Sequence, residues 1–261
     1  MSLPLRPQPC LEVRQLSVSY DRRCVIDAVS TVMHRSRITA IVGPSGCGKS
    51  TFLSCLNRLS DLTPGCRLSG SIRLDGDDIL SARTDLIRLR RRVGAIAQRP
   101  NPFPLSIRRN ITMPLEHHGL RHRDRREAVL ERVLRRVGLW REVRGRLDQP
   151  ALALSGGQQQ RLCLARALAL EPEVLLLDEP CSALDPVASG VVEDLIASLR
   201  GATTQVIVTH NLAQARRLAD DLIVFWTDEG RGTIVEQGPA DAVFTSPQSA
   251  ITAAYLSGSR G

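Results

Sequence analysis

The segment from Gly43 to Thr51, which reads GPSGCGKST, limits the possible folds of this chain more than any other feature. It fits the pattern G-x-x-x-x-G-K-[ST] and lies between a predicted strand, residues 38–42, and a predicted helix, residues 51–59. Glycines let such a loop curve so closely that backbone N–H groups converge on phosphate oxygens, and the helix directs the positive end of its dipole there. The sequence therefore predicts a nucleotide-phosphate site formed by Gly43, Pro44, Ser45, Gly46, Cys47, Gly48, Lys49, Ser50 and Thr51.

Lys49 is the only lysine among the 35 basic residues of the chain, and the other 34 are arginine. In a chain that uses arginine everywhere else, a compact ammonium on a flexible stem is indicated at this one position. We expect Lys49 to reach the β and γ phosphates of the nucleotide and to act in catalysis. The hydroxyl of Ser50, the next residue, is a predicted Mg²⁺ ligand.

Two carboxylates follow a continuous apolar run, residues 174–177, that is typical of a strand buried on both faces. Because α/β sheets bind ligands at the carboxyl ends of their strands, we expect Asp178 and Glu179 to lie near the glycine-rich loop. Asp178 is predicted to hold Mg²⁺, directly or through water. Glu179 is predicted to orient and deprotonate the attacking water, which makes it the candidate catalytic base.

A second glycine-rich segment, residues 154–161 (LSGGQQQR), precedes that strand. It lies at the start of a predicted helix, residues 161–170, and is expected to form a second anion site. Two distant anion sites in one chain are difficult to reconcile with one nucleotide. They are explained if two copies pair head to tail and each contributes its second site to the ATP of the other. The predicted nucleotide contacts in this segment are Ser155, Gly156, Gly157 and Gln158.

Strand and helix patterns alternate along most of the chain, which predicts an α/β fold with a largely parallel sheet covered by helices. The further predicted strands are residues 11–20, 24–32, 70–74, 93–97, 205–208 and 222–226, with an edge strand at 232–235. The further predicted helices are residues 85–92, 186–199, 212–218 and 240–244. Four prolines between residues 100 and 114 mark the beginning of an inserted, mostly helical lobe, residues 99–160.

Composition excludes several other classes of protein. A hydrophobic content of 43% with 24% charged residues is typical of a folded globular chain. No apolar stretch approaches the ~18 residues that would span a bilayer, and the N-terminus lacks the apolar region of a secretion signal. Seven cysteines without metal-ligand spacing indicate free thiols. The net charge of +8 arises from arginines interleaved with acids in amphipathic helical patterns, so nucleic-acid binding is not predicted.

The two glycine-rich motifs, in this order and with the carboxylate pair, resemble the ABC transporter ATPases, whose signature is LSGGQ. Four further residues match that family in order. The resemblance implies that Tyr20 stacks on adenine and that Gln98 contacts Mg²⁺ and the lytic water. It also implies that Asp185, the last residue of SALD, lies in the D-loop at a dimer interface, and that His210 contacts the γ-phosphate. Gln98 and His210 thereby join Lys49 and Glu179 as candidate catalytic residues, and Gln98 joins Ser50 and Asp178 as a candidate Mg²⁺ ligand.

The resemblance also implies the organisation of the chain as one ABC ATPase domain, residues 11–258. Residues 11–98 and 161–258 are expected to form a P-loop NTPase core of the RecA type, with a mostly parallel sheet and an N-terminal antiparallel β subdomain. Residues 99–160 are expected to form the inserted helical subdomain that carries the signature.

Segments around the motifs are similar to the ATPases of phosphate-specific import systems. They are GPSGCGKST with the following FLSCLNRLSDLTPG, QRPNPFPLSIRRNI after Gln98, LSGGQQQRL, and the closing AAYLSGSRG. This similarity implies a translocase that couples ATP hydrolysis, with Mg²⁺, to the import of inorganic phosphate. The implied partners are a second copy of the chain, two integral membrane permease subunits and an extracytoplasmic phosphate-binding protein. The implied location is the cytoplasmic face of the cell membrane.

Three alternatives remain open at this point. The chain could be the ATPase of an importer for another solute, such as polar amino acids. It could be a non-transport ABC ATPase that acts on DNA, although such chains carry long coiled-coil or zinc insertions. It could also be a regulatory module that binds nucleotide without turnover, which Glu179 and His210 disfavour.

Overall fold

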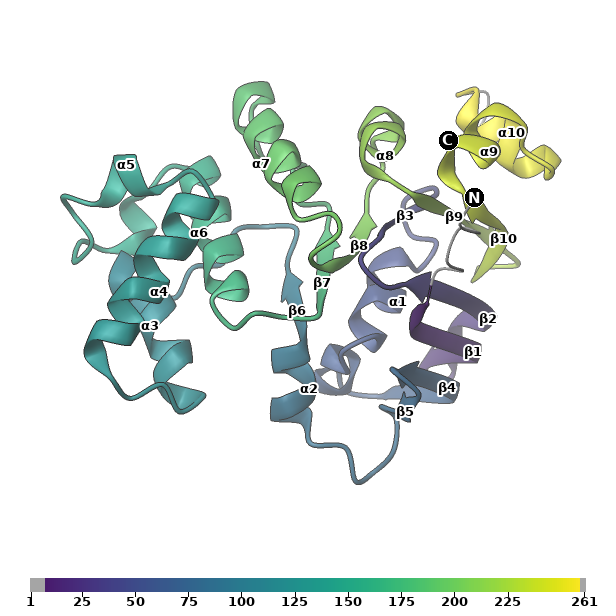
Figure 1. Cartoon of the computed structure of the whole chain (residues 1–261). Helices are drawn as coiled ribbons and strands as arrows, with labels where there is room; N and C mark the ends of the chain where they lie inside the picture. Colours follow the sequence, from purple (N-terminus) through teal and green to yellow (C-terminus); the bar gives the residue numbers. More distant parts are fainter. Residues whose placement is uncertain (1–7, 259–261) are drawn as a thin grey trace, which may run out of the picture.

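A computed structural model describes residues 8–258, and within them the strands form a single sheet with the order β5-β4-β1-β2-β10-β9-β3-β8-β7-β6 (Figure 1). Residues 259–261, the end of the closing stretch noted above, and residues 1–7 lie outside the described residues. Part of the sheet is parallel and part antiparallel, and the two parts differ in how they are covered.

The parallel part consists of five neighbouring strands in which β3 pairs with β9 and β8, β8 with β7, and β7 with β6. Every residue of β3 and of β8 is buried, as expected for strands covered on both faces, and both strands are mainly apolar. The strands are β3 (Ile38–Val42), β6 (Val93–Ile96), β7 (Val174–Asp178), β8 (Thr204–Val208) and β9 (Asp221–Asp228). The predicted parallel core is confirmed.

Four of the antiparallel strands come from the N-terminal third of the chain. Strand β1 pairs with β2 on one side and with β4 on the other, and β5 extends β4. Their bounds are β1 (Pro9–Tyr20), β2 (Arg23–His34), β4 (Cys66–Leu74) and β5 (Asp77–Asp78). The expectation of an N-terminal antiparallel subdomain is confirmed.

Strand β10 (Arg231–Pro239) joins the two parts, so the prediction of an edge strand at residues 232–235 was wrong. It pairs antiparallel with β9 along its length and touches β2 through one bridge, between Gly232 and Ile26. A Cβ atom on Gly232 would lie 2.2 Å from the carbonyl oxygen of Cys47. A glycine here therefore lets β10 pass directly beneath the phosphate loop. No local sequence pattern predicts this contact between Gly232 and Cys47.

Helix α1 (Lys49–Cys55) lies between the two parts of the sheet and begins two residues earlier than predicted. It ends at Cys55 rather than at residue 59, because Arg58 adopts a left-handed conformation with φ of 59° before a 3-10 turn, Leu59–Leu62. Phe52 anchors α1 in the core, with its ring centroid 5.3 Å from that of Phe225.

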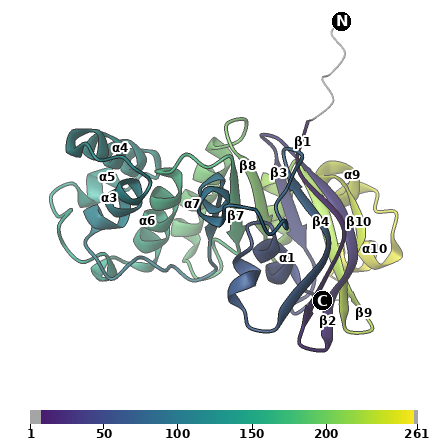
Figure 2. The same cartoon turned by 90° about the horizontal axis from the view of Figure 1, so that it is seen from below.

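The predicted helical lobe is confirmed and lies at one end of the molecule (Figures 1 and 2). It contains α3 (Ile107–His117), α4 (Arg123–Arg136), α5 (Trp140–Val143), a 3-10 turn (Ala151–Ala153) and the beginning of α6 (Gly156–Leu168). Helix α6 crosses the proposed boundary between residues 160 and 161 and packs against both the lobe and β6. The division into residues 11–98, 99–160 and 161–258 stays a prediction.

The remaining helices cover the sheet: α2 (Leu86–Arg92), α7 (Pro186–Ser198), α8 (Leu212–Leu218), α9 (Ala240–Thr245) and α10 (Ala250–Leu256). The C-terminal helices α9 and α10 enclose a small apolar cluster with residues of β3 and β9, which includes Val42 and Tyr255. None of the helices within residues 8–258 is long and apolar enough to cross a membrane. All seven cysteines are free thiols, as predicted.

Candidate functional site

Four adjacent parallel strands end at the same edge of the sheet, and the candidate catalytic residues follow them. Strand β3 leads into the phosphate loop at Gly43, and β8 is followed by His210. Strand β7 ends in Asp178 and Glu179, and β6 is followed by Gln98. The structure thus brings together residues that lie up to 167 positions apart in the sequence, from Gly43 to His210.

Three glycines of the phosphate loop, Gly43, Gly46 and Gly48, have positive φ angles that other residues rarely adopt. Gly43 has φ of 146°, and a Cβ atom there would lie 2.2 Å from the carbonyl oxygen of Phe225. Gly48, with φ of 94°, precedes the first residue of α1. Inside the loop, Nζ of Lys49 donates hydrogen bonds of 2.7 Å to the carbonyl oxygens of Gly43 and Pro44. The side chain of Lys49 is therefore held at the centre of the loop, where phosphate oxygens would converge.

The C-terminal helix α10 supports the loop from behind, a contact that sequence reasoning missed. The backbone N–H of Gly43 donates a 3.2 Å hydrogen bond to the hydroxyl oxygen of Tyr255. Burial raises the pKa of the Tyr255 hydroxyl, and it likewise raises the pKa of the Cys47 thiol inside the loop. Tyr255 is one of only two tyrosines in the chain, and this rarity was the only feature of the sequence that could have indicated a special role for it.

The predicted Mg²⁺ ligands form a set of oxygen donors. The hydroxyl of Ser50 donates a 3.0 Å hydrogen bond to Oδ1 of Asp178. Burial raises the pKa of Asp178, the charge of Glu179 adds to the rise, and the Ser50 hydrogen bond and the Lys49 charge oppose it. Within residues 8–258 no group of three or more His, Cys, Asp or Glu side chains is arranged so that it could hold a metal ion by itself. This donor set fits Mg²⁺, which takes one or two carboxylates together with substrate phosphates and water, better than a protein-caged ion.

Glu179 is held by side chains from the segments that follow the two neighbouring strands, β6 and β8. Its Oε2 accepts a 2.7 Å hydrogen bond from Nε2 of Gln98, and its Oε1 lies 3.1 Å from Nδ1 of His210, an ion pair when that imidazole is protonated. Its backbone has φ of 44°, and its N–H donates to the carbonyl of Val208 across the sheet. Such left-handed residues concentrate at functional sites because the surrounding structure must enforce them. Both oxygens of the Glu179 carboxylate are thus held in place by neighbouring side chains.

The second glycine-rich segment begins α6 at Gly156, five residues earlier than the predicted helix at 161–170. The reason is a capping box: the side chain of Ser155 accepts from the N–H of Gln158, whose side chain in turn accepts from the N–H of Ser155. Both glycines therefore lie in the first helical turn, where unpaired N–H groups favour an anion. A Cβ atom on Gly157 would lie 2.9 Å from Cβ of Ala188 in α7, whereas Gly156 faces open space.

Gln160 connects this helix to the segment after β7, a contact that sequence reasoning also missed. Its side chain is 1% exposed, and Nε2 donates a 3.1 Å hydrogen bond to the carbonyl of Pro180, the residue after Glu179. The signature helix and the candidate base are therefore linked within one chain. The repeated glutamines of SGGQQQ gave no indication which of them is buried.

The two remaining candidates, Tyr20 and Asp185, lie at two different places. Tyr20 is the last residue of β1. Burial raises the pKa of its hydroxyl, and a side-chain hydrogen bond with Thr51, at the end of the phosphate loop, opposes that rise. Asp185 caps α7 by accepting from the N–H groups of Val187 and Ala188 at 2.9 Å, a role that sequence reasoning did not assign. Helices α6 and α1 lie on opposite sides of strands β6–β8 in both views, so one chain does not bring its two glycine-rich sites together (Figures 1 and 2).

Comparisons with known proteins match these features. Residues 26–182 match the family model described as ABC transporter. The chain is 56% identical over 255 residues, 98% of its length and 92% of the relative's, to the phosphate import ATP-binding protein PstB 1 of Nitrosococcus oceani. Its fold is similar to that of CbiO1 from Clostridium perfringens, described as part of the ABC transporter complex cbiONQ. That similarity has a TM-score of 0.77 and 28% identity, and it covers 95% of each chain.

Proposed function

The chain belongs to the ABC transporter family, and from that premise we propose that it is the ATP-hydrolysing subunit of an importer for inorganic phosphate. The observation that carries the catalytic part is the arrangement of Lys49, Glu179, Gln98 and His210 at one edge of the sheet. The phosphate part is supported by the similarity to PstB 1 over nearly the whole chain.

ATP binding is proposed to use the phosphate loop and Tyr20. The ammonium of Lys49 already accommodates two oxygen acceptors at 2.7 Å, and phosphate oxygens of the nucleotide would replace these carbonyls. The N–H groups at the start of α1 add a positive dipole end directed at the same phosphates. Tyr20 would provide an aromatic face for adenine at the end of β1.

Hydrolysis is proposed to use Glu179 as the base that takes a proton from the attacking water. Gln98 and His210 hold the two carboxylate oxygens, so the base needs no reorganisation before it accepts the proton. When bound, Mg²⁺ would neutralise charge that develops on the phosphates. Ser50, Asp178 and the amide oxygen of Gln98 would hold it.

The complete site is proposed to form between two copies of the chain. Ser155, Gly156, Gly157 and Gln158 of one copy would contact the ATP held by the phosphate loop of the other, and Asp185 would lie near the same interface. Gly156 faces open space and the first-turn N–H groups of α6 lack helical partners, so this end of α6 can accept a γ-phosphate from outside the chain. ATP would then hold the pair closed, and cleavage of the γ-phosphate would release it.

The membrane partners are proposed to bind near the segment after Gln98. There the guanidinium of Arg166 lies 4.2 Å from the ring centroid of Phe103 and donates hydrogen bonds of 3.1 Å to the carbonyl and side chain of Asn101. This segment is therefore fixed to α6 and can transmit movement between the ATP site and a bound permease. The proposed assembly has two permease subunits and an extracytoplasmic phosphate-binding protein, with this chain peripheral at the cytoplasmic face.

Reconstitution of the chain with its membrane partners in vesicles tests the proposal. We expect ATP hydrolysis to be stimulated by phosphate together with the binding protein, and labelled phosphate to enter the vesicles only when ATP is present. Stimulation by polar amino acids and not by phosphate would assign another solute. Stimulation of the isolated chain by DNA would instead favour an ATPase that acts on nucleic acid.

A further inference from the structure

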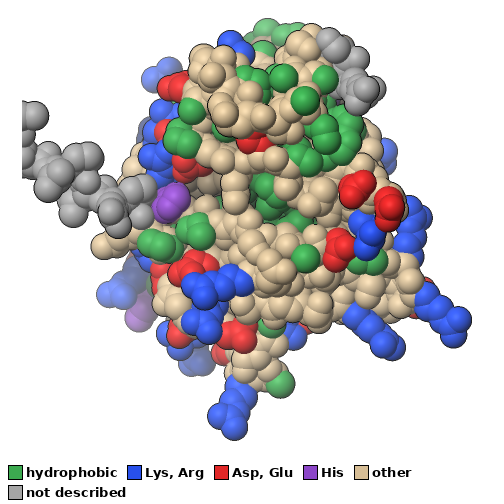
Figure 3. Space-filling view, turned by 90° about the vertical axis from the view of Figure 1, so that its right-hand side faces the viewer, with side chains coloured by type: hydrophobic (Ala, Val, Ile, Leu, Met, Phe, Trp, Pro, Cys, Tyr) green, Lys and Arg blue, Asp and Glu red, His purple; other side chains and the backbone are tan. Residues whose placement is uncertain are grey.

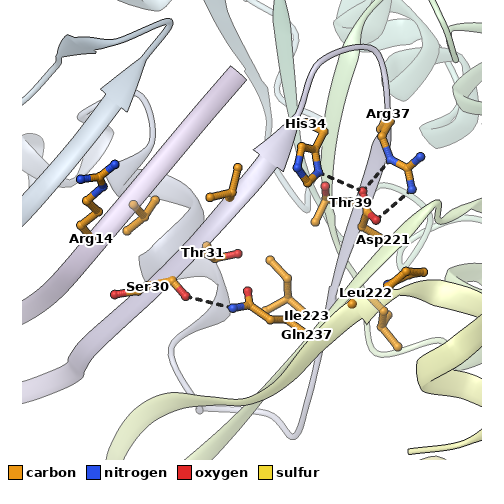
Figure 4. Close-up of a pocket in the computed structure, with 14 residues that line it drawn as sticks. Arg14, Ser30, Thr31, His34, Arg37, Thr39, Asp221, Leu222, Ile223 and Gln237 are labelled. Atoms are coloured by element: carbon orange, nitrogen blue, oxygen red, sulfur yellow. Dashed lines mark hydrogen bonds and ion pairs between the residues drawn. The ribbon is translucent and has the colours of Figure 1, made fainter. Parts of the chain in front are cut away.

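Many ion pairs of this chain lie at the surface, and Figure 3 shows acidic and basic side chains next to one another on one face. Such pairs contribute little because water screens them. Another pair joins two strands at the edge of the sheet opposite to the phosphate loop, where Arg37 donates to both oxygens of Asp221, at 2.7 and 2.8 Å (Figure 4). Glu193 differs from both, because it is buried at the contact between α7 and α8, the helices that follow β7 and β8.

Glu193 is an acid on α7 with two partners on α8. The residue is 6% exposed, and its Oε1 accepts a 2.9 Å hydrogen bond from Nε2 of Gln214, which is itself 4% exposed. The other oxygen of Glu193 forms an ion pair with Arg217, one turn later on α8. Burying a charge is unfavourable unless the charge is paired and hydrogen-bonded. These contacts therefore fix α8 to α7 at the position of Gln214.

Gln214 also contacts the segment that follows the candidate base. Cys181 lies two residues after Glu179. Burial raises the pKa of its thiol, and a side-chain hydrogen bond with Gln214 opposes that rise. The same segment is held by α7, because the hydroxyl of Ser189 donates a 3.5 Å hydrogen bond to the carbonyl of Cys181. One buried amide thus joins α7, α8 and the segment after Glu179.

His210 lies directly before α8, and its ring is 59% exposed, so packing of the ring contributes little to its placement. The next residue, Asn211, caps α8 by accepting a 3.1 Å hydrogen bond from the N–H of Gln214. The N–H of Asn211 in turn donates at 3.0 Å to the hydroxyl of Thr209. The position of α8 therefore determines where the ring of His210 meets Glu179, at 3.1 Å.

We propose that Gln214 and Glu193 are positioning residues, which together hold His210 against Glu179 during ATP hydrolysis. This inference rests on the proposed function and adds to it a buried pair outside the predicted nucleotide and metal contacts. Gln214 acts through α8, which follows His210 directly, and through the segment after Glu179. Without the pair, α8 shifts relative to α7, and a displacement of about 1 Å can slow a reaction by a factor of about 10².

Gln214→Leu tests the inference, because leucine fills most of the space of the amide but cannot donate to Glu193. We expect kcat for ATP hydrolysis by the whole chain to fall about 10-fold or more, while the Kd for a fluorescent ATP analogue stays within about twofold. Glu193→Gln combined with Gln214→Glu keeps a donor opposite an acceptor and leaves Arg217 one turn from the carboxylate. This exchange should return kcat to within about threefold of the unmodified chain.

Gln205→Leu is the matched control. Gln205 is also a buried glutamine, 0% exposed, and its Nε2 donates a 3.0 Å hydrogen bond to the carbonyl of Ile196 in α7. This bond removes one buried contact of α7 when it is lost but does not involve α8. We expect the kcat of the control to stay within about twofold of the unmodified chain, whatever urea unfolding shows for its stability.

A double-mutant cycle with His210→Ala separates positioning from general stability. Once the imidazole is absent, Gln214→Leu has no contact between His210 and Glu179 left to disturb. In that background it should slow single-turnover cleavage of radiolabelled ATP by less than about twofold. An equal loss in both backgrounds would assign Gln214 a purely structural role and overturn the inference.

Three other results would also overturn it: an unchanged kcat in Gln214→Leu, an equal loss in Gln205→Leu, or an exchange variant as slow as Gln214→Leu. Failure of the unmodified chain to cleave ATP is a different outcome, because it would contradict the proposed function itself.

Discussion

Replacement of Glu179 by glutamine separates the binding of ATP from its hydrolysis. The amide keeps the shape of the side chain and one acceptor oxygen, but it cannot take a proton from water. In the unmodified chain, Nε2 of Gln98 and Nδ1 of His210 lie 2.7 and 3.1 Å from the two carboxylate oxygens. In the variant, one of these two side chains faces the NH₂ group of the new amide instead of an oxygen. The contacts of Lys49 with the phosphate loop do not involve Glu179 and stay intact.

The expected size of the effect follows from the role assigned to Glu179. A positioned general base contributes a factor of about 10²–10⁴ to the rate, which corresponds to about 2.7–5.4 kcal/mol of activation free energy. We therefore expect kcat to fall by a factor of about 10²–10⁴, while the Kd for ATP changes by less than about threefold.

Steady-state phosphate release and equilibrium binding of a fluorescent ATP analogue measure the two quantities. Glu229→Gln is a matched control, because Glu229 also has a positive φ, 47°, but its side chain is 77% exposed in the turn between β9 and β10. The control should keep full activity. Hydrolysis by Glu179→Gln within a factor of three of the unmodified chain would refute the assignment of the base.

Three further predictions follow from individual contacts. Gly157→Ala places a methyl group 2.9 Å from Cβ of Ala188, so α6 must shift against α7; we expect hydrolysis about 10-fold slower or worse, with ATP binding to the single chain unchanged in the fluorescence assay. Tyr255→Phe leaves the buried N–H of Gly43 unpaired, so urea unfolding should show a loss of about 1–3 kcal/mol, and an unchanged unfolding midpoint would contradict the contact. Burial raises the pKa of Asp178 above its unfolded value, so ionisation destabilises the fold as pH rises through that interval. Asp178→Asn should therefore raise the Tm at pH 7 without nucleotide, with a gain that shrinks toward about pH 4, and should remove the stabilisation by Mg-ATP.

The sequence predicted the strand-end residues well because their signals are local. An apolar run that ends in polar residues identifies both a buried strand and the side chains at its carboxyl end, as with Asp178 and Glu179. The parallel order of the strands then places those side chains near the phosphate loop without further information. The resemblance to ABC ATPases supplied Gln98 and His210, whose single residues carry no signal of their own.

The contacts that were missed connect residues far apart in the chain. Tyr255 and Gly43 are 212 positions apart, and the path of β10 depends on the absence of a side chain at Gly232. No local pattern reports such contacts. The start of α6 was different, because Ser155 and Gln158 have the spacing of a capping box and could have been recognised.

The central claim is that ATP binds at Lys49 and that the site is completed by the second glycine-rich segment, residues 155–158, of another copy of the chain. The mass of the Glu179→Gln chain in solution with Mg-ATP tests this claim most directly. Light scattering coupled to size exclusion, together with the amount of retained nucleotide, gives both stoichiometries. We expect two 28.6 kDa chains holding two ATP molecules, and single chains when Lys49 is also changed to alanine. A chain that retains one ATP and stays single at every concentration would contradict the shared site.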